Sequence, residues 1–239
     1  MAIRLAALVG ACVVLAGCAG APVGDRPVVR IVEAAQPSPV VPLSPFLPTA
    51  QELASALHTG PTGLMGQLVE GGADMLLRSV NAGEATPPDC LGAAYRLQEA
   101  VYDDSPVQAV ATNSWAGGGF DGPPVSGFFG VVQMTNPAAA QSFFAATNER
   151  WRRCNGETVA QPDAAEMSRI ADVAFDGHVV SASVLHASAG AASPTAQRAV
   201  GLAGDFIVEV EITDPRPPGL GRPVADVAGM ILDKITTHR

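Results

Sequence analysis

The most regular hydrophobic pattern in this chain of 239 residues runs from Asn136 to Cys154. Asn136 can cap a helix, and Pro137 suits the first helical position, where its missing N–H is not needed. Side chains suited to a core then recur every three or four residues, at positions 140, 143, 144, 147 and 151. The pattern predicts an amphipathic helix that ends at Cys154, beside an Asn-Gly pair typical of a helix stop.

A second strong helical pattern lies at the other end of the domain. Residues 224–235 carry apolar side chains on one continuous face, with Asp226 early and Lys234 late, as the helix dipole prefers. Weaker helical spacing predicts shorter helices at residues 49–57, 68–81 and 91–101. Extended, β-biased runs predict strands at residues 107–115, 125–135, 167–173, 178–187, 196–202 and 205–213.

Alternation within residues 206–212 indicates how these strands are arranged. Glu209 and Glu211 face one way with Ile207, and the apolar residues between them face the other way. This pattern is typical of a sheet with one solvated face. Together with helices at both ends of the strand region, it predicts an α+β fold, in which helices pack on one face of an antiparallel sheet.

The N-terminal segment has the pattern of a secretory signal. Arg4 precedes a short apolar run, and small residues precede Cys18. The tetrapeptide Leu-Ala-Gly-Cys that ends at Cys18 resembles the bacterial lipobox, in which a diacylglycerol is attached to the cysteine and the chain is cut before it. We therefore expect a lipoprotein signal peptide at residues 1–17 and a membrane anchor of acyl chains, such as palmitate, on Cys18. An ordinary cleaved signal and an uncleaved anchor are the alternatives.

The next segment is rich in proline. Seven prolines between residues 19 and 48 favour an extended tether, so the sequence predicts a lipidated cysteine and linker over residues 18–48. Residues 49–239 are then long enough for one domain with a sizeable core. No second long apolar run follows, which predicts a domain that is anchored to the membrane without spanning it.

Charge excludes one class of partner. The net charge is −9, the pI is about 4.8 and Lys234 is the single lysine, so no basic patch is available to bind nucleic acid.

Two cysteines remain in the predicted domain, Cys90 and Cys154. An even pair of cysteines in an exported protein favours a disulfide, with two free thiols as the alternative. No histidine or further cysteine lies at ligand spacing from either one, so no metal site is predicted.

No catalytic motif is present in the sequence: a G-x-S-x-G elbow, S-x-x-K, H-E-x-x-H and a phosphate loop are all missing. Asp172, Asp176 and His178 can in principle orient a general base, but a polar turn is the favoured interpretation. Trp115, beside a run of three glycines, is a candidate for lining a ligand cleft, with a core tryptophan as the equal alternative. We predict no catalytic residue, no cofactor and no enzyme activity.

Three arginines at positions 150, 152 and 153 flank Trp151. They are candidates for an anion site, and a solvated helix face is the favoured interpretation.

Several motifs in a fixed order resemble the PknH-type extracellular sensor domain family. They are P-P-D-C at 87–90, the N-P-A-A-A-x-x-F-F helix start, its W-R-R-C end, and V-A-x-x-I-L-D-K-I in the last helix. The resemblance covers roughly residues 49–237. In this family the domain is the extracellular part of mycobacterial serine/threonine kinases, and it also occurs in lipoproteins. The resemblance implies an α+β domain with a cleft for an extracellular small molecule and no known catalytic residues.

One departure from the family affects the last pair of strands. Many relatives carry a second disulfide that brackets this hairpin, whereas this chain has Ala196 and about Thr213 at the corresponding positions. The hairpin is therefore expected to be held by packing and ladder hydrogen bonds alone.

These observations lead to two hypotheses for an extracytoplasmic, lipid-anchored envelope protein. The first is a non-catalytic module that binds an unidentified small molecule or envelope component. The alternative is an interaction protein that docks another cell-envelope protein through its sheet edge or a helix face. A deep apolar pocket with a few polar groups favours the first, and an exposed apolar patch without a pocket favours the second.

Overall fold

The computed structural model describes residues 36–60, 63–80, 83, 85–118, 124–161, 165–188, 191–192, 195–216 and 223–238. The predicted signal peptide, Cys18 and most of the predicted linker lie outside the described residues. Within the described part of the chain, no helix is long and apolar enough to cross a membrane.

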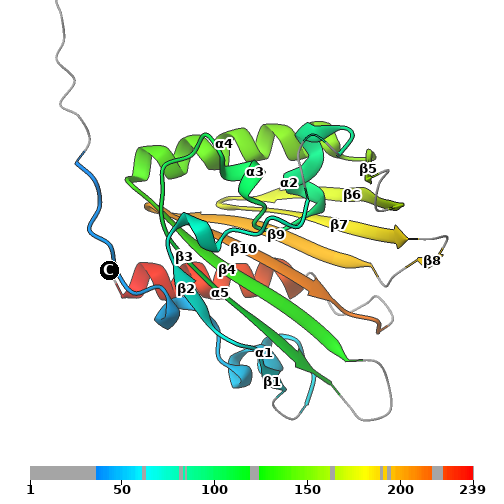
Figure 1. The fold of residues 1–239 in the computed structure, drawn as a ribbon. Coiled ribbons are helices and arrows are strands. Elements are labelled where there is room, and N and C mark those ends of the chain that lie inside the picture. The colour runs from blue at the N-terminus through cyan, green and yellow to red at the C-terminus, as the bar shows by residue number, and fades with distance from the viewer. Residues whose placement is uncertain are drawn as a thin grey trace, which may run out of the picture. The chain divides into compact units, whose positions relative to one another are not determined.

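A single antiparallel sheet organises the described residues (Figure 1). Its ten strands follow the order β1-β3-β4-β10-β9-β7-β6-β5, with β2 also paired to β3 and β8 to β7. The strands are β1 (Leu64–Met65), β2 (Val69–Gly71), β3 (Val107–Gly117), β4 (Val125–Met134), β5 (Thr158–Gln161), β6 (Glu166–Asp176), β7 (Val179–Ser188), β8 (Ala191–Ala192), β9 (Ala196–Ala203) and β10 (Phe206–Thr213). The predicted α+β class with an antiparallel sheet is confirmed.

Five α-helices pack on this sheet within the described residues: α1 (Ala50–Ala56), α2 (Leu91–Ala94), α3 (Glu99–Tyr102), α4 (Pro137–Cys154) and α5 (Pro223–Thr237). Three single-turn 3₁₀ helices accompany them: η1 (Ser44–Phe46), η2 (Ala73–Met75) and η3 (Pro88–Cys90). The two strongest helical predictions, α4 and α5, are confirmed. Asn136 caps α4 as expected, because its side-chain oxygen accepts a hydrogen bond of 2.9 Å from the backbone N–H of Ala139.

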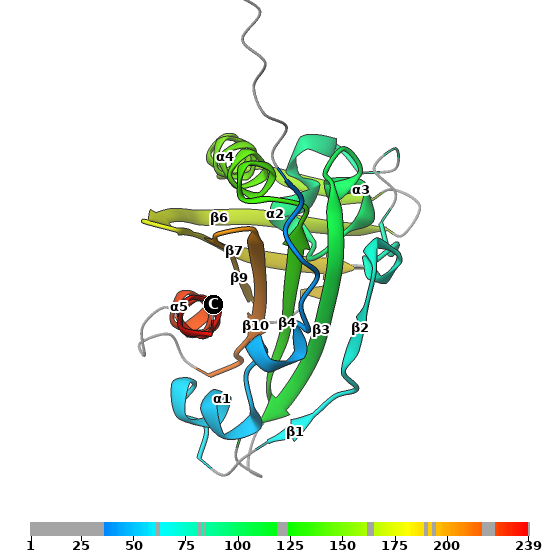
Figure 2. The same ribbon diagram turned by 90° about the vertical axis from the view of Figure 1, so that its left-hand side faces the viewer.

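The helices cover both faces of the sheet, which corrects the prediction that they pack on one. Val208 and Val210 point into a core with α1 and α5, whereas Ile207, on the same face as Glu209, points into a second core with α2, α3 and α4. Figure 2 shows α4 and α5 on opposite sides of β6 and β7. The face assigned to solvent is therefore covered around Glu209, which is only 4% exposed.

Of the weaker helical predictions, the one over 68–81 is wrong, and the one over 91–101 holds only at its two ends, where α2 and α3 lie. In place of a helix over 68–81, residues 69–71 form β2 and residues 73–75 form η2. Gly71 and Gly72 weaken a helix there, and the edge of β3 offers β2 a ladder of backbone hydrogen bonds. Between α2 and α3 the chain is extended, and Leu97 adopts a positive φ of 47°.

The packed domain begins before residue 49, which corrects the predicted end of the linker. The backbone N–H of Ser38 donates to the carbonyl of Thr135 at 2.6 Å. Leu43 is fully buried, and Phe46 is 6% exposed with its ring 5.5 Å from that of Phe206. Apolar side chains among the prolines therefore belong to the core.

The register of the β9–β10 hairpin pairs the two positions at which many relatives are expected to carry a second disulfide. Ala196 and Thr213 are direct cross-strand partners, and the turn places Gly204 at a φ of 61°. Ladder hydrogen bonds and core packing hold these strands together, as expected.

Candidate functional site

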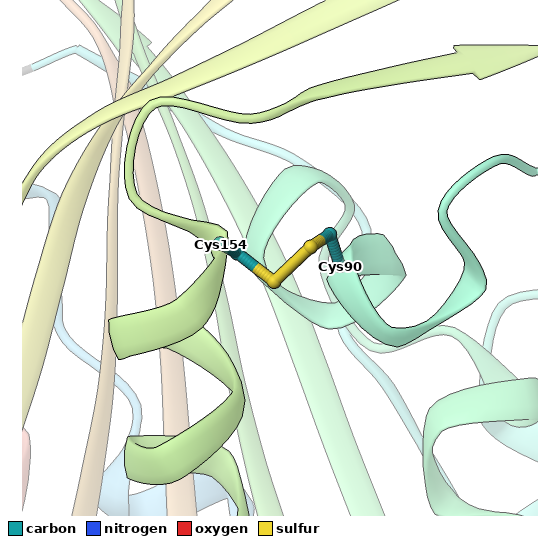
Figure 3. Close-up of a disulfide and its surroundings, with 2 residues drawn as sticks. All are labelled: Cys90 and Cys154. Atoms are coloured by element: carbon teal, nitrogen blue, oxygen red, sulfur yellow. A yellow bond between two sulfur atoms is a disulfide. The ribbon is translucent and has the colours of Figure 1, made fainter.

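The predicted disulfide between Cys90 and Cys154 is confirmed (Figure 3). It joins η3 to the last residue of α4, with the two Cα atoms 5.5 Å apart. It therefore fixes the short helical segments before β3 against α4, the longest helix of the described residues.

Beneath these linked helices lies a cavity of about 430 Å³, here called the α4 cavity. Its walls come from η3, α2, α3 and one stripe of α4, and β9 and β10 contribute to its lining. The apolar lining residues include Leu91, Val101, Phe143, Trp151 and Val200. Four charged residues also line it: Asp89, Asp104, Arg150 and Glu209.

Helical spacing explains how α4 forms this wall. Residues 139, 142, 143, 146, 147, 150 and 151 line the cavity, and they recur every three or four positions along the helix. Phe143 is fixed by Tyr102, whose ring stacks on it at a centroid distance of 4.5 Å. The apolar part of the cavity is thus built by aromatic side chains that are themselves held in place.

A buried ionic network supports the cavity from the sheet side. Glu209 accepts hydrogen bonds from the Tyr102 hydroxyl at 2.6 Å, the Leu97 N–H at 3.0 Å and the Arg198 guanidinium at 2.6 Å. Arg198 is fully buried and also donates to the carbonyl of Gly92 at 2.6 Å. Both charges are therefore paired and hydrogen-bonded, as buried charges must be.

Burial, together with the neighbouring Glu209 carboxylate, raises the pKa of Tyr102 well above its usual value. The phenol is therefore a hydrogen-bond donor at neutral pH, which suits its contact with the carboxylate.

Sequence reasoning missed Arg198 and treated Glu209 as solvated. The register of the β9–β10 hairpin contained a usable signal, because it places Arg198 directly opposite Glu211. Opposite charges that face each other on adjacent strands typically form a stabilising cross-strand pair.

Trp115 is in the core and does not line the α4 cavity. It is 2% exposed, and its ring packs so closely on Gly63 and Gly117 that a Cβ there would lie 2.6 Å and 2.1 Å from it. Its indole N–H has no hydrogen-bond partner among the described residues. The structure thus favours the alternative of a core tryptophan, and residue 115 also lies along the wall of a second hollow, beside Met65 and Ser114.

The other site residues predicted from the sequence, near the β6–β7 turn and on α4, do not form a common site in the structure. Asp176 and His178 are exposed at the β6–β7 turn, which fits the polar-turn interpretation, whereas Asp172 is exposed at an irregularity within β6. Arg150 lines the α4 cavity, whereas Arg152 pairs with Glu149 on the solvated face of the helix.

A Ser–His contact occurs elsewhere on the sheet, where Ser168 Oγ lies 2.8 Å from His186 Nδ1. Ser168 is fully buried, with its hydroxyl also 2.7 Å from that of Tyr95, so it is not placed to attack a substrate. The described residues contain no group of three or more His, Cys, Asp or Glu side chains that could hold a metal ion.

These features define a disulfide-linked α+β domain with a cavity of small-molecule size. A sequence model of the PknH-like extracellular domain matches residues 38–234, and the chain belongs to that family. The family indicates an extracytoplasmic location for the domain.

The relatives are kinases of which this chain matches one part. It is 26% identical over 202 residues to serine/threonine-protein kinase PknH of Mycobacterium tuberculosis (strain ATCC 25618 / H37Rv), covering 81% of this chain and 31% of the kinase. The same kinase of Mycobacterium bovis is also 26% identical and 32% covered. The chain thus spans about a third of the length of these relatives, and the match is to an extracellular domain rather than a catalytic one.

The crystal structure of the extracellular domain of PknH from M. tuberculosis has the same fold. It superposes with a TM-score of 0.69 at 21% identity, covering 84% of this chain and 98% of that chain.

Proposed function

We propose that this chain is a lipid-anchored envelope protein whose extracellular domain binds a small molecule in the α4 cavity, without catalysis. The observation that carries the proposal is the cavity itself. Its volume of about 430 Å³ falls within the ~300–1,000 Å³ of small-molecule sites, and its lining combines apolar side chains with a few charged groups.

The arrangement of these groups suggests how a ligand is held. Phe143 and Trp151 are buried and present apolar surface, whereas Asp89, Asp104 and Arg150 are exposed and line the same cavity. A ligand with an apolar body and a polar end therefore fits the cavity, with its polar end toward solvent. Membership of a sensor-domain family supports such a binding role.

Native mass spectrometry of the full chain purified from its own host tests this proposal. We expect a mass increment from a co-purifying ligand, and we expect Ala146→Phe to abolish it, because Ala146 lines the cavity. Ala145→Phe is the matched control: Ala145 is the preceding exposed residue of α4 and does not line the cavity. An unliganded mass for the wild type, or a ligand that Ala146→Phe retains, would contradict the proposal.

The membrane anchor needs its own test. Metabolic labelling with palmitate should label the wild type and not Cys18→Ala, and the variant should partition into the aqueous phase of a Triton X-114 extract. Cys12→Ala is the control, since residue 12 lies within the segment expected to be removed. Labelling of the Cys18→Ala variant would show that the anchor is elsewhere.

An interaction role is the second candidate, and one observation favours it. Leu64, Leu68 and Val69 are 82%, 45% and 37% exposed in the segment that pairs with the edge of β3. Apolar side chains gathered on a surface are typical of docking sites. A photo-crosslinker at position 64, with one at the exposed Val40 as the control, should then capture an envelope protein in cells.

A further inference from the structure

A second hollow lies on the same face of the sheet as the α4 cavity, and no residue of α4 lines it. Two cavities of about 460 Å³ and 310 Å³ share three lining residues, Arg96, Glu211 and Thr213, and therefore lie next to each other. We call the two together the polar groove. Its larger part runs along β1, β3 and β4, and its smaller part reaches Glu166 on β6 and His186 on β7.

Strand register explains why polar side chains gather here. Ser114, Phe128 and Glu211 are direct cross-strand neighbours on β3, β4 and β10. Ser126 and Thr213 form the next such pair along the strands. Because cross-strand partners point to the same face, the row presents hydroxyl groups, an aromatic ring and a carboxylate side by side.

The charged groups of the groove already have partners of opposite sign. Arg96 pairs with Glu211 and lies over the Phe128 ring, 4.3 Å from its centroid. Glu166 accepts a hydrogen bond of 3.2 Å from the Tyr95 hydroxyl. A strongly charged ligand would therefore have to compete with an existing ion pair, which disfavours an ionic ligand.

The imidazole of His186 is also satisfied without a net charge. Burial lowers its pKa, against the raising effect of Glu211 and Glu166, so the ring is neutral at pH 7. Its Nδ1 is 2.8 Å from Ser168 Oγ.

Hydrogen-bonding capacity nevertheless remains in the groove. The guanidinium of Arg96 and the carboxylate of Glu211 place donors directly beside acceptors. A ligand hydroxyl both donates and accepts, so neighbouring hydroxyls on one ring match this pair, and the rings of Phe128 and Tyr95 match an apolar ring face.

We infer that the polar groove binds a neutral, polyhydroxylated ligand of the carbohydrate class. Both parts of the groove are of small-molecule size, ~300 Å³ or more, so together they accommodate more than one sugar ring. An oligosaccharide is the ligand that uses the whole length of the groove.

The test applies the full chain to an array of neutral and anionic glycans and measures the strongest binder by titration calorimetry. We expect a neutral oligosaccharide to bind, and Glu211→Gln to weaken it at least about tenfold, because a charged acceptor is lost. Thr213→Val removes a hydroxyl without changing side-chain shape, and it should weaken binding without affecting the fold. His178→Gln is the control: His178 is exposed at the β6–β7 turn and lines neither cavity, so glycan affinity should be unchanged.

Three outcomes overturn the inference. One is an array without a neutral glycan that binds, and another is binding that survives both groove substitutions. The third is a preference for anionic glycans, or binding of the polyamine spermidine in place of sugars, because the groove would then select for charge. Since the α4 cavity is tested with a different variant and readout, failure here leaves the proposed function standing.

Discussion

Arg198 carries a charge and yet has no exposed surface. Its guanidinium donates to Glu209 and to the carbonyl of Gly92, and it lies 5.6 Å from the Trp151 ring centroid. Removing one partner of such a buried pair leaves the other charged and unpaired, which costs far more than losing a surface contact. The stability of the fold therefore depends strongly on Arg198, in the ionic network behind the α4 cavity.

We predict that Arg198→Met lowers the free energy of unfolding by about 3–5 kcal/mol, measured by urea denaturation. Adding Glu209→Gln should recover part of the loss, because the uncompensated charge is removed while the amide still accepts from Tyr102. Arg78→Ala is the control: Arg78 is 67% exposed in its ion pair with Glu99, and such pairs contribute about 0–1 kcal/mol. Equal effects of the two arginine substitutions would show that burial of the pair is immaterial.

The lowered pKa of His186 predicts a pH dependence with a defined sign. Burial is the main cause, with Arg198 and Arg96 acting in the same direction, and Glu211 and Glu166 opposing it. The unfolded state thus binds a proton more readily than the folded state below about pH 6.5. Stability from this residue is complete above that pH and decreases as the pH falls through the lowered pKa.

Denaturation curves between pH 5 and 7.5 should therefore show a loss of stability in the wild type that His186→Gln reduces. His178→Gln is the control, because His178 is exposed at the β6–β7 turn. An unchanged pH dependence in the His186 variant would assign the effect to other groups.

At the scale of the elements, α4 carries both the disulfide and a stripe of buried aromatic side chains. Its capped start, its aromatic stripe and its final cysteine were all visible in the sequence, because each depends on local chemistry or on helical spacing. What α4 lines was not visible, since the cavity also needs Leu91, Val101 and Val200 from distant segments.

The disulfide at the end of α4 closes a loop with a sequence separation of 64 residues. In the chain-entropy account, such a crosslink stabilises the fold by about 4 kcal/mol. Cys90→Ala/Cys154→Ala should lose about that much, and a reductant should destabilise the wild type without affecting the double variant. A wild type that takes up two alkyl groups without reductant would contradict the crosslink itself.

For the whole molecule, the start of the packed domain is the main difference from the sequence prediction. Phe46→Ala should cost about 3–5 kcal/mol, because it removes a buried ring that contacts Phe206. Val40→Ala is the control, since Val40 is 65% exposed. If both changes are neutral in thermal denaturation, residues before 49 act only as a tether.

The helical prediction over 68–81 failed for a tertiary reason. The spacing of Leu68, Met75 and Leu76 fits a helix, but residues 69–71 gain more by adding to the edge of β3. Likewise, Glu209 alternates as a solvated residue should, and only the packing of α2–α4 against that face gives it Tyr102 and Arg198 as partners.

The sequence by itself determined the features that depend on neighbours along the chain: the two long amphipathic helices, the main strands, the cysteine pair and the family. Helical and strand periodicity, capping and cysteine count are local signals, so they can be identified without a fold. Only the tertiary structure decided which face of the sheet each helix covers, where the domain begins, and that one sheet face has the α4 cavity as well as the polar groove. These depend on the strand order β4-β10-β9-β7, which brings together residues that are far apart in the chain.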